Sequence, residues 1–282
     1  LNRDQINKKR VFLDQAARLN SLTIPESQSI VFRRATIEEN SPNFINTDKL
    51  LEVLNKGANY ITYMGHGAGA LWGDNSILDQ NSAKLLQNNG KYPIIASLTC
   101  FIGAFDSQAP TLGEVFITEA NKGAVGLFGA SGVSLIYNQY MFGFFLNRYV
   151  YQYQYDIGDA IRLARLDFYQ NGQDYQLENG VANTPQFANF RDYIVMDFNY
   201  LGDPTLSVKK AKVANLTTNS TSISAKQKIS FTITGLPNSN YQGKLRLIDY
   251  YGEEISEMSL NGNLQEFSSE FQVPDSLTKT QE

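Results

Sequence analysis

The alternation of strand-like and helix-like segments in the first two thirds of the chain most constrains the fold. Apolar runs at residues 59–64, 94–99 and 124–128 predict buried strands. Between them, residues 82–88 and 112–121 have apolar spacing and terminal glycines typical of helices. Because parallel strands need long crossover connections, usually helices, this order predicts an α/β domain with a mostly parallel sheet flanked by helices.

Other segments extend this pattern. A strand is expected at residues 30–32, and further helices are expected at residues 1–20, 47–54, 138–153 and 157–170.

The pattern of apolar and polar residues changes after Lys209. Residues 228–234, 243–248 and 266–273 alternate apolar and polar side chains with a period of two, and turn-forming residues separate them. We therefore expect an α/β domain over residues 1–210 and a small all-β, immunoglobulin-like sandwich over residues 211–282. The Asn, Ser and Thr residues just after the boundary are interpreted as a linker.

Composition excludes several classes of protein. The 24 Lys and Arg residues against 28 Asp and Glu residues give a net charge of -4, so no basic surface for nucleic acid is expected. A single cysteine excludes an internal disulfide. No apolar run reaches the length of a membrane span. The polar start without methionine and the polar end predict a cropped or processed piece of a longer protein.

The chain has one histidine and one cysteine, and each follows a predicted strand. His66 follows the 59–64 run and Cys100 ends the 94–99 run. Open α/β sheets bind their ligands at the carboxyl ends of strands, and a thiol becomes a nucleophile when a base such as imidazole assists it. The alternatives are a packed, inert cysteine and a structural histidine. One His and one Cys do not make a zinc site, so neither a metal nor a cofactor is predicted.

The glycines beside His66 and the single tryptophan suggest further roles. Gly65 and Gly67 let the backbone approach a substrate, and amides at Gly67 and Cys100 could donate to an oxyanion. Trp72 could line a substrate-binding pocket, or it could belong to the core.

These residues resemble the gingipain family of cysteine peptidases over residues 45–206. The resemblance rests on Tyr63-Met-Gly-His-Gly67 with Trp72, Ser97-Leu-Thr-Cys100-Phe-Ile-Gly103-Ala-Phe-Asp106, Thr111-Leu-Gly-Glu114, the Lys122–Gly132 stretch and Leu201-Gly-Asp-Pro204. It implies a caspase-like fold, and it is consistent with an immunoglobulin-like module after the catalytic domain.

The resemblance also implies roles for individual residues. Cys100 matches the nucleophile and His66 the general acid/base, while the amides of Gly67 and Cys100 match the oxyanion donors. The family usually has further strands before the histidine strand, and residues 1–45 hold only part of that region, so the resemblance implies that the catalytic domain is N-terminally incomplete here. The acidic residues that orient the histidine or bind a basic substrate side chain in some members lie in that region. They have no assigned counterpart here, so no specificity for Arg or Lys follows.

The resulting hypothesis is a secreted or bacterial surface cysteine endopeptidase that acts on proteins or peptides through a thioester acyl-enzyme. Two alternatives stay open. One is a peptidase-like secretion component that processes C-terminal sorting signals, and the other is a non-catalytic surface or adhesion module that keeps the fold.

Overall fold

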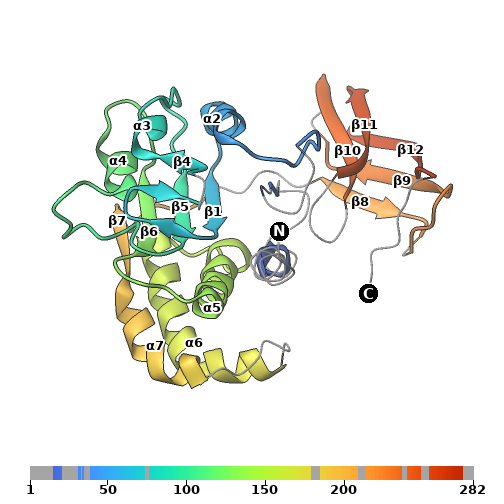
Figure 1. The fold of residues 1–282 in the computed structure, drawn as a ribbon. Coiled ribbons are helices and arrows are strands. Elements are labelled where there is room, and N and C mark those ends of the chain that lie inside the picture. The colour runs from blue at the N-terminus through green and yellow to red at the C-terminus, as the bar shows by residue number, and fades with distance from the viewer. Residues whose placement is uncertain are drawn as a thin grey trace. The chain divides into compact units, whose positions relative to one another are not determined.

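The computed structural model describes residues 15–20, 31–32, 34, 39–73, 76–178, 185–208, 214–220, 222–236, 240–248 and 254–275. The chain divides into two compact units, one built mainly from residues 45–210 and the other mainly from residues 211–282 (Figure 1). Most of the helix predicted at residues 1–20 lies outside the described residues, although residues 15–20 are helical. Residues 31–32 form no strand, and Ile30 lies outside the described residues.

A four-stranded mixed sheet forms the centre of the first unit. Its strands are β1 (Tyr60–Met64), β5 (Ile94–Leu98), β6 (Gly126–Ala130) and β7 (Phe198–Gly202), in the order β1-β5-β6-β7. The first three strands run parallel, and β7 is antiparallel to β6. The α/β class with a largely parallel sheet therefore agrees with the prediction. The antiparallel edge strand was not predicted.

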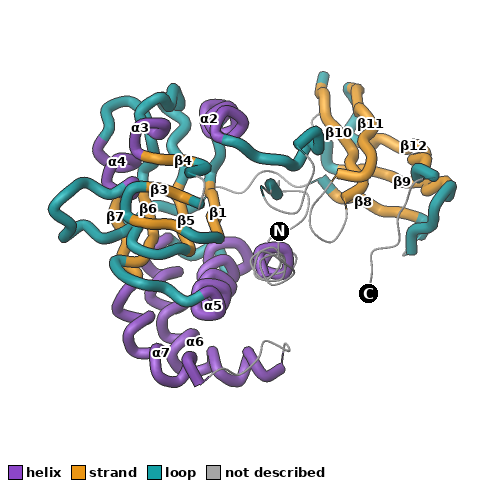
Figure 2. Tube along the Cα trace, in the orientation of Figure 1, coloured by secondary structure: helices purple, strands orange, loops and turns teal. Residues whose placement is uncertain are grey.

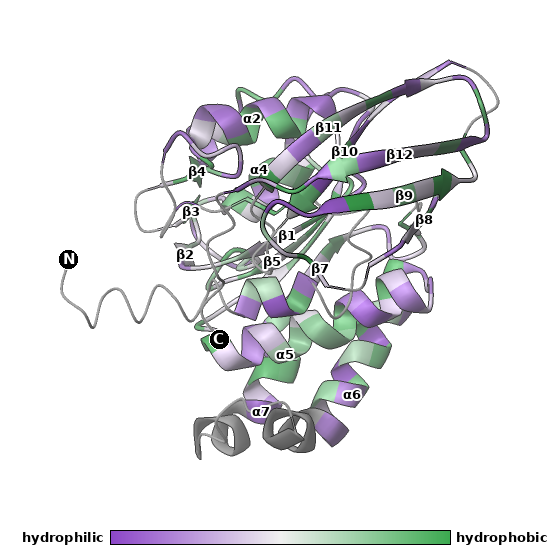
Figure 3. Cartoon of the chain, turned by 90° about the vertical axis from the view of Figure 1, so that its right-hand side faces the viewer, coloured by the Kyte–Doolittle hydropathy of each residue, from purple (hydrophilic) through white to green (hydrophobic). Residues whose placement is uncertain are grey.

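Helices cover one face of the sheet with a large apolar core. They are α5 (Ile136–Asn147), a π-helical extension of it at Arg148–Gln152, α6 (Ile157–Glu178) and α7 (Pro185–Asp197). Figure 2 shows these helices grouped on one side of the strands, and Figure 3 colours stretches of α5 and α6 as hydrophobic. Their buried side chains share one cluster with alternate residues of β5: Ile94, Ala96 and Leu98. A strand directs alternate side chains to opposite faces, so the intervening residues belong to the other layer.

The opposite face carries shorter helices. They are α2 (Thr47–Lys56), the single-turn α3 (Gln80–Ala83) and α4 (Leu112–Thr118). Ile95 of β5 and Leu127 of β6 pack here with side chains of α2 and α4. Both faces of the sheet are therefore covered, as a largely parallel sheet requires.

A small three-stranded antiparallel sheet follows β1. It consists of β2 (Gly67–Ala68), β3 (Leu71–Trp72) and β4 (Leu78–Asp79), in the order β2-β3-β4. These strands were not predicted because two-residue strands have no detectable periodicity. They fold the segment after His66 back on itself.

The second unit contains two antiparallel sheets. One has the order β12-β9-β8, from β8 (Asn215–Thr218), β9 (Lys228–Thr234) and β12 (Glu266–Gln272), and the other pairs β10 (Tyr241–Ile248) with β11 (Glu254–Gly262). One apolar cluster joins residues of both sheets, including Phe231 of β9 and Leu260 of β11. The alternating patterns correctly located β9, β10 and β12. Residues of the predicted linker instead form β8, and β11 was not predicted.

The lengths of several helices differ from the expected ones. The helix expected at residues 82–88 is only the single turn of α3, and α6 extends beyond its expected end at residue 170. Helix α7 was not predicted. None of the helices among the described residues is both long enough and apolar enough to cross a membrane.

Candidate active site

Strands β1 and β5 bring the two candidate residues to the same edge of the sheet. Met64 pairs in register with Leu98, and these are the last residues of the two strands. His66 lies two residues beyond Met64, and Cys100 lies two residues beyond Leu98. Neighbouring strands are spaced about 5 Å apart. The two residues therefore leave adjacent strands at matching positions.

Hydrogen bonds to its carbonyl oxygen fix the backbone of His66. The Tyr63 hydroxyl donates to this oxygen at 2.7 Å, and the Gly73 N–H donates to it at 2.8 Å. The His66 side chain is exposed, whereas its backbone is held at the start of the small sheet. The imidazole is thus presented to solvent from a fixed backbone position.

Trp72 supports this segment from the core. Its ring is 1% exposed, stacks on Tyr63 with centroids 4.5 Å apart, and packs against Phe116. The indole N–H donates to the hydroxyl of Ser97 in β5 at 2.8 Å. Of the two roles considered for Trp72, the structure places it in the core. Through Ser97 it joins the small sheet to the strand that carries Cys100.

The segments that follow β1 and β5 also meet beyond the strand ends. A Cβ atom placed on Gly67 would lie 2.6 Å from the hydroxyl oxygen of Thr99, the residue before Cys100. The Leu112 N–H donates to the carbonyl of Gly69 at 2.6 Å, which ties the small sheet to the start of α4. The backbone next to His66 therefore packs directly on the side chain of Thr99, the residue before Cys100.

Cys100 is half-buried, and the segment between β6 and α5 contacts its sulfur. The Ser134 N–H donates to Sγ at 3.3 Å, and the thiol lies 3.4 Å from the Ser134 carbonyl oxygen. The next residue, Phe101, has a φ of 57°, which is uncommon for a residue with a side chain. Its N–H donates to the Gly132 carbonyl at 2.9 Å. This sharp turn at the end of β5 leaves the thiol at the sheet edge, and strained turns of this kind cluster at functional sites.

Two residues near the end of α7 bond to the 131–134 segment, which contacts the thiol. Tyr193 interacts electrostatically with Cys100, and its hydroxyl hydrogen-bonds to the Asp197 carboxylate. Asp197 is 7% exposed, and burial raises its pKa from the usual 3.8 to about 6, although hydrogen bonds from the Gly132 N–H and Tyr193 oppose the shift. Burial and the nearby Asp197 raise the pKa of Tyr193, so its hydroxyl stays protonated.

Sequence reasoning missed Tyr193, Asp197, Phe101 and Ser134. One signal was available, because Asp197 is an isolated acid in the apolar run Ile194-Val-Met-Asp-Phe198. The others have no sequence signature, since their role depends on where α7 and the 131–134 segment meet β5.

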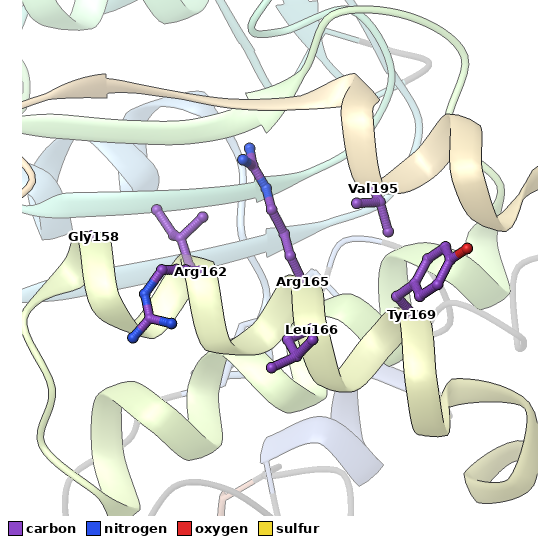
Figure 4. Close-up of a pocket in the computed structure, with 7 residues that line it drawn as sticks. Gly158, Arg162, Arg165, Leu166, Tyr169 and Val195 are labelled. Carbon is purple, nitrogen blue, oxygen red and sulfur yellow. The ribbon is translucent and has the colours of Figure 1, made fainter.

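A separate surface hollow of about 500 Å³ lies between α6 and α7 (Figure 4). It is lined by Gly158, Ile161, Arg162, Arg165, Leu166, Tyr169 and Val195. Neither His66 nor Cys100 lines it, so it is distinct from the candidate site. Among the described residues, no group of three or more His, Cys, Asp and Glu side chains could hold a metal ion.

The fold and the site define an α/β protein that carries a thiol and an imidazole at neighbouring strand ends, an arrangement that suits cysteine-dependent hydrolysis. The family model for peptidase family C25 matches residues 1–209, which is most of the chain. The chain therefore belongs to peptidase family C25, the family of the gingipains. The resemblance stated from the sequence is confirmed.

Solved structures show distant similarity. One is described as a protease (18% identity, 79% of this chain and 56% of that chain, TM-score 0.49). Another is the Arg-specific cysteine proteinase gingipain R (15% identity, 81% and 50%, TM-score 0.49). A third is the complex of the pro- and mature domains of RgpB from Porphyromonas gingivalis (16% identity, 81% and 51%, TM-score 0.46). The chain spans about half the length of these proteins. The comparison with curated proteins gave no match.

Proposed function

We propose that this protein is a cysteine endopeptidase in which Cys100 is the nucleophile and His66 the general acid/base. The observation that carries the proposal is the register of β1 and β5, which places the two residues at matching positions beyond adjacent strand ends. Membership of peptidase family C25 supports the same chemistry. The half-buried state of Cys100 also favours it over an inert core cysteine.

The mechanism follows from these two side chains. His66 accepts the thiol proton, and the sulfur of Cys100 attacks the carbonyl carbon of the scissile peptide bond. The tetrahedral adduct collapses to a thioester as His66 returns the proton to the leaving amine. Water, deprotonated by His66, then attacks the thioester and releases the acid and the free thiol.

The amides of Gly67 and Cys100 are proposed as the donors to the oxyanion. They lie on the two segments that pack together at Thr99, so they can converge on one point at the strand ends. Two backbone donors fixed before the reaction stabilise charge as it develops on the substrate oxygen.

The finer fold assignments are proposals of the same kind. A caspase-like arrangement for the first unit is supported by the parallel β1-β5-β6 strands with helices on both faces. An immunoglobulin-like sandwich for the second unit is supported by its two antiparallel sheets and common core. We also propose a secreted or surface location and a longer precursor with further domains.

The test uses a broad peptide library and three forms of the protein: the unsubstituted chain, Cys100→Ala and His66→Ala. Nucleophile and base act as a unit, so each substitution is expected to reduce kcat/KM about a thousandfold or more. Circular dichroism and thermal unfolding check that each variant keeps its fold. Turnover that persists in Cys100→Ala would rule out the mechanism.

The same experiment separates the two alternatives. A sorting component that transfers its acyl group would give aminolysis products when a small amine is added, whereas a hydrolase would give mainly the free acid. A non-catalytic module would show neither product, and Cys100 would resist a peptidyl acyloxymethyl ketone probe. Mapping the labelled tryptic peptide identifies the modified residue, because Cys100 is the only cysteine of the chain.

A further inference from the structure

The 131–134 segment, between β6 and α5, has no regular secondary structure, and its four successive N–H groups all have identifiable partners. Backbone donors in such a segment must find partners outside a helix or a sheet. The Ser131 N–H donates to the Asp197 carbonyl at 2.8 Å, and the Gly132 N–H donates to the Asp197 carboxylate. The Ser134 N–H donates to the sulfur of Cys100 at 3.3 Å.

The remaining amide of the segment, that of Val133, hydrogen-bonds to the hydroxyl of Tyr193. This hydroxyl in turn donates to Asp197, since the pKa of Tyr193 is raised and the hydroxyl keeps its proton. Tyr193 therefore contacts the segment one residue before Ser134. Tyr193 is 44% exposed, and its hydroxyl is the group that bonds to the segment.

Close packing fixes the geometry further. A Cβ atom on Gly132 would lie 2.1 Å from the Tyr193 hydroxyl oxygen and 2.9 Å from Oδ1 of Asp197, so a side chain at this position would displace the Tyr193 hydroxyl. On its other side, the Gly132 carbonyl accepts the N–H of Phe101, the residue after Cys100. The end of α7, the 131–134 segment and the end of β5 thus form one continuous hydrogen-bonded unit.

We infer that Tyr193 and Asp197 are positioning residues for the Cys100 thiol, because they hold the 131–134 segment so that the Ser134 N–H points at the sulfur. An N–H directed at sulfur complements a thiolate, the form that reacts. The consequence for peptide hydrolysis rests on the proposed function. The consequence for the reactivity of the thiol does not, so the two can be tested separately.

The test measures the second-order rate constant for alkylation of Cys100 by iodoacetamide at pH 7 in the folded, full-length chain. Tyr193→Phe removes only the hydroxyl and with it the hydrogen bond to the Val133 N–H. The Ser134 N–H is then held less firmly toward the sulfur, and we expect alkylation to be about threefold to tenfold slower. Tyr169→Phe is the matched control, because Tyr169 on α6 is equally exposed at 43%. Its alkylation rate should equal that of the unsubstituted chain.

Substitution of Asp197 provides the second arm. Asp197→Ala removes the acceptor of the Gly132 N–H and should slow alkylation at least as much as Tyr193→Phe. Asp197→Asn keeps an amide oxygen in place and should restore most of the rate. Asp192→Asn, on the same helix and with a 79% exposed side chain, is its control and should have no effect. If Asp197→Ala fails to fold, the alkylation rates of Tyr193→Phe and Asp197→Asn still decide whether the two residues position the thiol.

The outcomes separate this inference from the proposed function. Slower alkylation in Tyr193→Phe supports the positioning role, whether or not the unsubstituted chain hydrolyses peptides. An unchanged or faster rate in Tyr193→Phe overturns it, even if the protein is an active peptidase. Equal rates for Asp197→Asn and Asp197→Ala would also overturn it, because the acceptor oxygen would then be irrelevant.

Discussion

At the scale of single residues, Gly67 is a position where the candidate site has no room for a side chain. A Cβ atom here would lie 2.6 Å from Oγ1 and 2.9 Å from Cγ2 of Thr99, and 3.1 Å from the carbonyl oxygen of Leu71. Thr99 is fully buried, and Leu71 belongs to β3, so neither can move away easily. The space at this position therefore sets how closely the His66 segment approaches the Cys100 segment.

We predict that Gly67→Ala separates the two segments, lowers kcat/KM at least tenfold, and lowers the free energy of unfolding by about 1–3 kcal/mol, as overpacking usually does. Gly69→Ala is the matched control in the same segment, since its Cβ would meet other atoms only at 3.6 and 3.7 Å. Its stability should change by less than about 0.5 kcal/mol. Peptide hydrolysis and urea unfolding measure both effects. Equal behaviour of the two variants would contradict the prediction.

Asp197 gives a prediction about pH. Burial raises its folded-state pKa to about 6, above the usual 3.8 of an unfolded chain, so the neutral acid is favoured in the folded state. The stability that this preference contributes is complete below about pH 4 and is lost as the pH rises through about 6. A shift of about two pKa units corresponds to roughly 3 kcal/mol.

We therefore predict that Asp197→Asn gains stability relative to the unsubstituted chain between pH 4 and pH 7.5, by up to roughly 3 kcal/mol. The free energy of unfolding of both proteins, measured in urea at the two pH values, gives this difference. Other carboxyl groups titrate in both proteins and cancel in the comparison. A difference that does not vary with pH would show that Asp197 is not a buried acid with a raised pKa.

At the scale of elements, the sequence pattern was sufficient to locate a strand wherever burial imposes a regular spacing of apolar side chains. Strands β5 and β6 are fully buried apolar runs, and β9 alternates along its length, so all three could be located. Helix α7 and strand β7 were missed because Asp197 ends the helix and Phe198 begins the strand, with no turn residue between them. The predicted helix at residues 82–88 is shorter, since α3 ends at Ala83. Asn88, at the expected helix end, instead uses its side chain to bond both backbone groups of Gly123.

In the candidate site, the positions set by regular strands were predictable, and the positions set by tertiary packing were not. His66 and Cys100 follow strands, so the rule that parallel strands end at one sheet edge brings them together. Ser134 contacts the thiol, and Tyr193 and Asp197 are linked to it only through the tertiary packing of α7 on the 131–134 segment. No local spacing encodes that contact, and it became visible only in the hydrogen bonds of the folded chain.

At the scale of the whole molecule, the apolar cores of the described residues are separate. The two clusters on either side of the mixed sheet draw side chains from Leu19 to Val208, and the third draws them only from Ala214 onward. Each unit thus buries its own apolar side chains, the property expected of an independently folding domain. The second unit contains neither His66 nor Cys100.

We predict that removal of residues 211–282 leaves the first unit folded and its thiol reactive. Ser134 contacts Cys100, and Tyr193 and Asp197 bond to the 131–134 segment. All of these residues belong to the first unit and remain in the shortened chain. Far-ultraviolet circular dichroism should show the helices retained, and the rate constant for alkylation of Cys100 by iodoacetamide should stay within about twofold of the full-length value. If the 1–210 chain keeps its helical signal but its thiol no longer reacts, the second unit contributes to the site, and this division of roles is wrong.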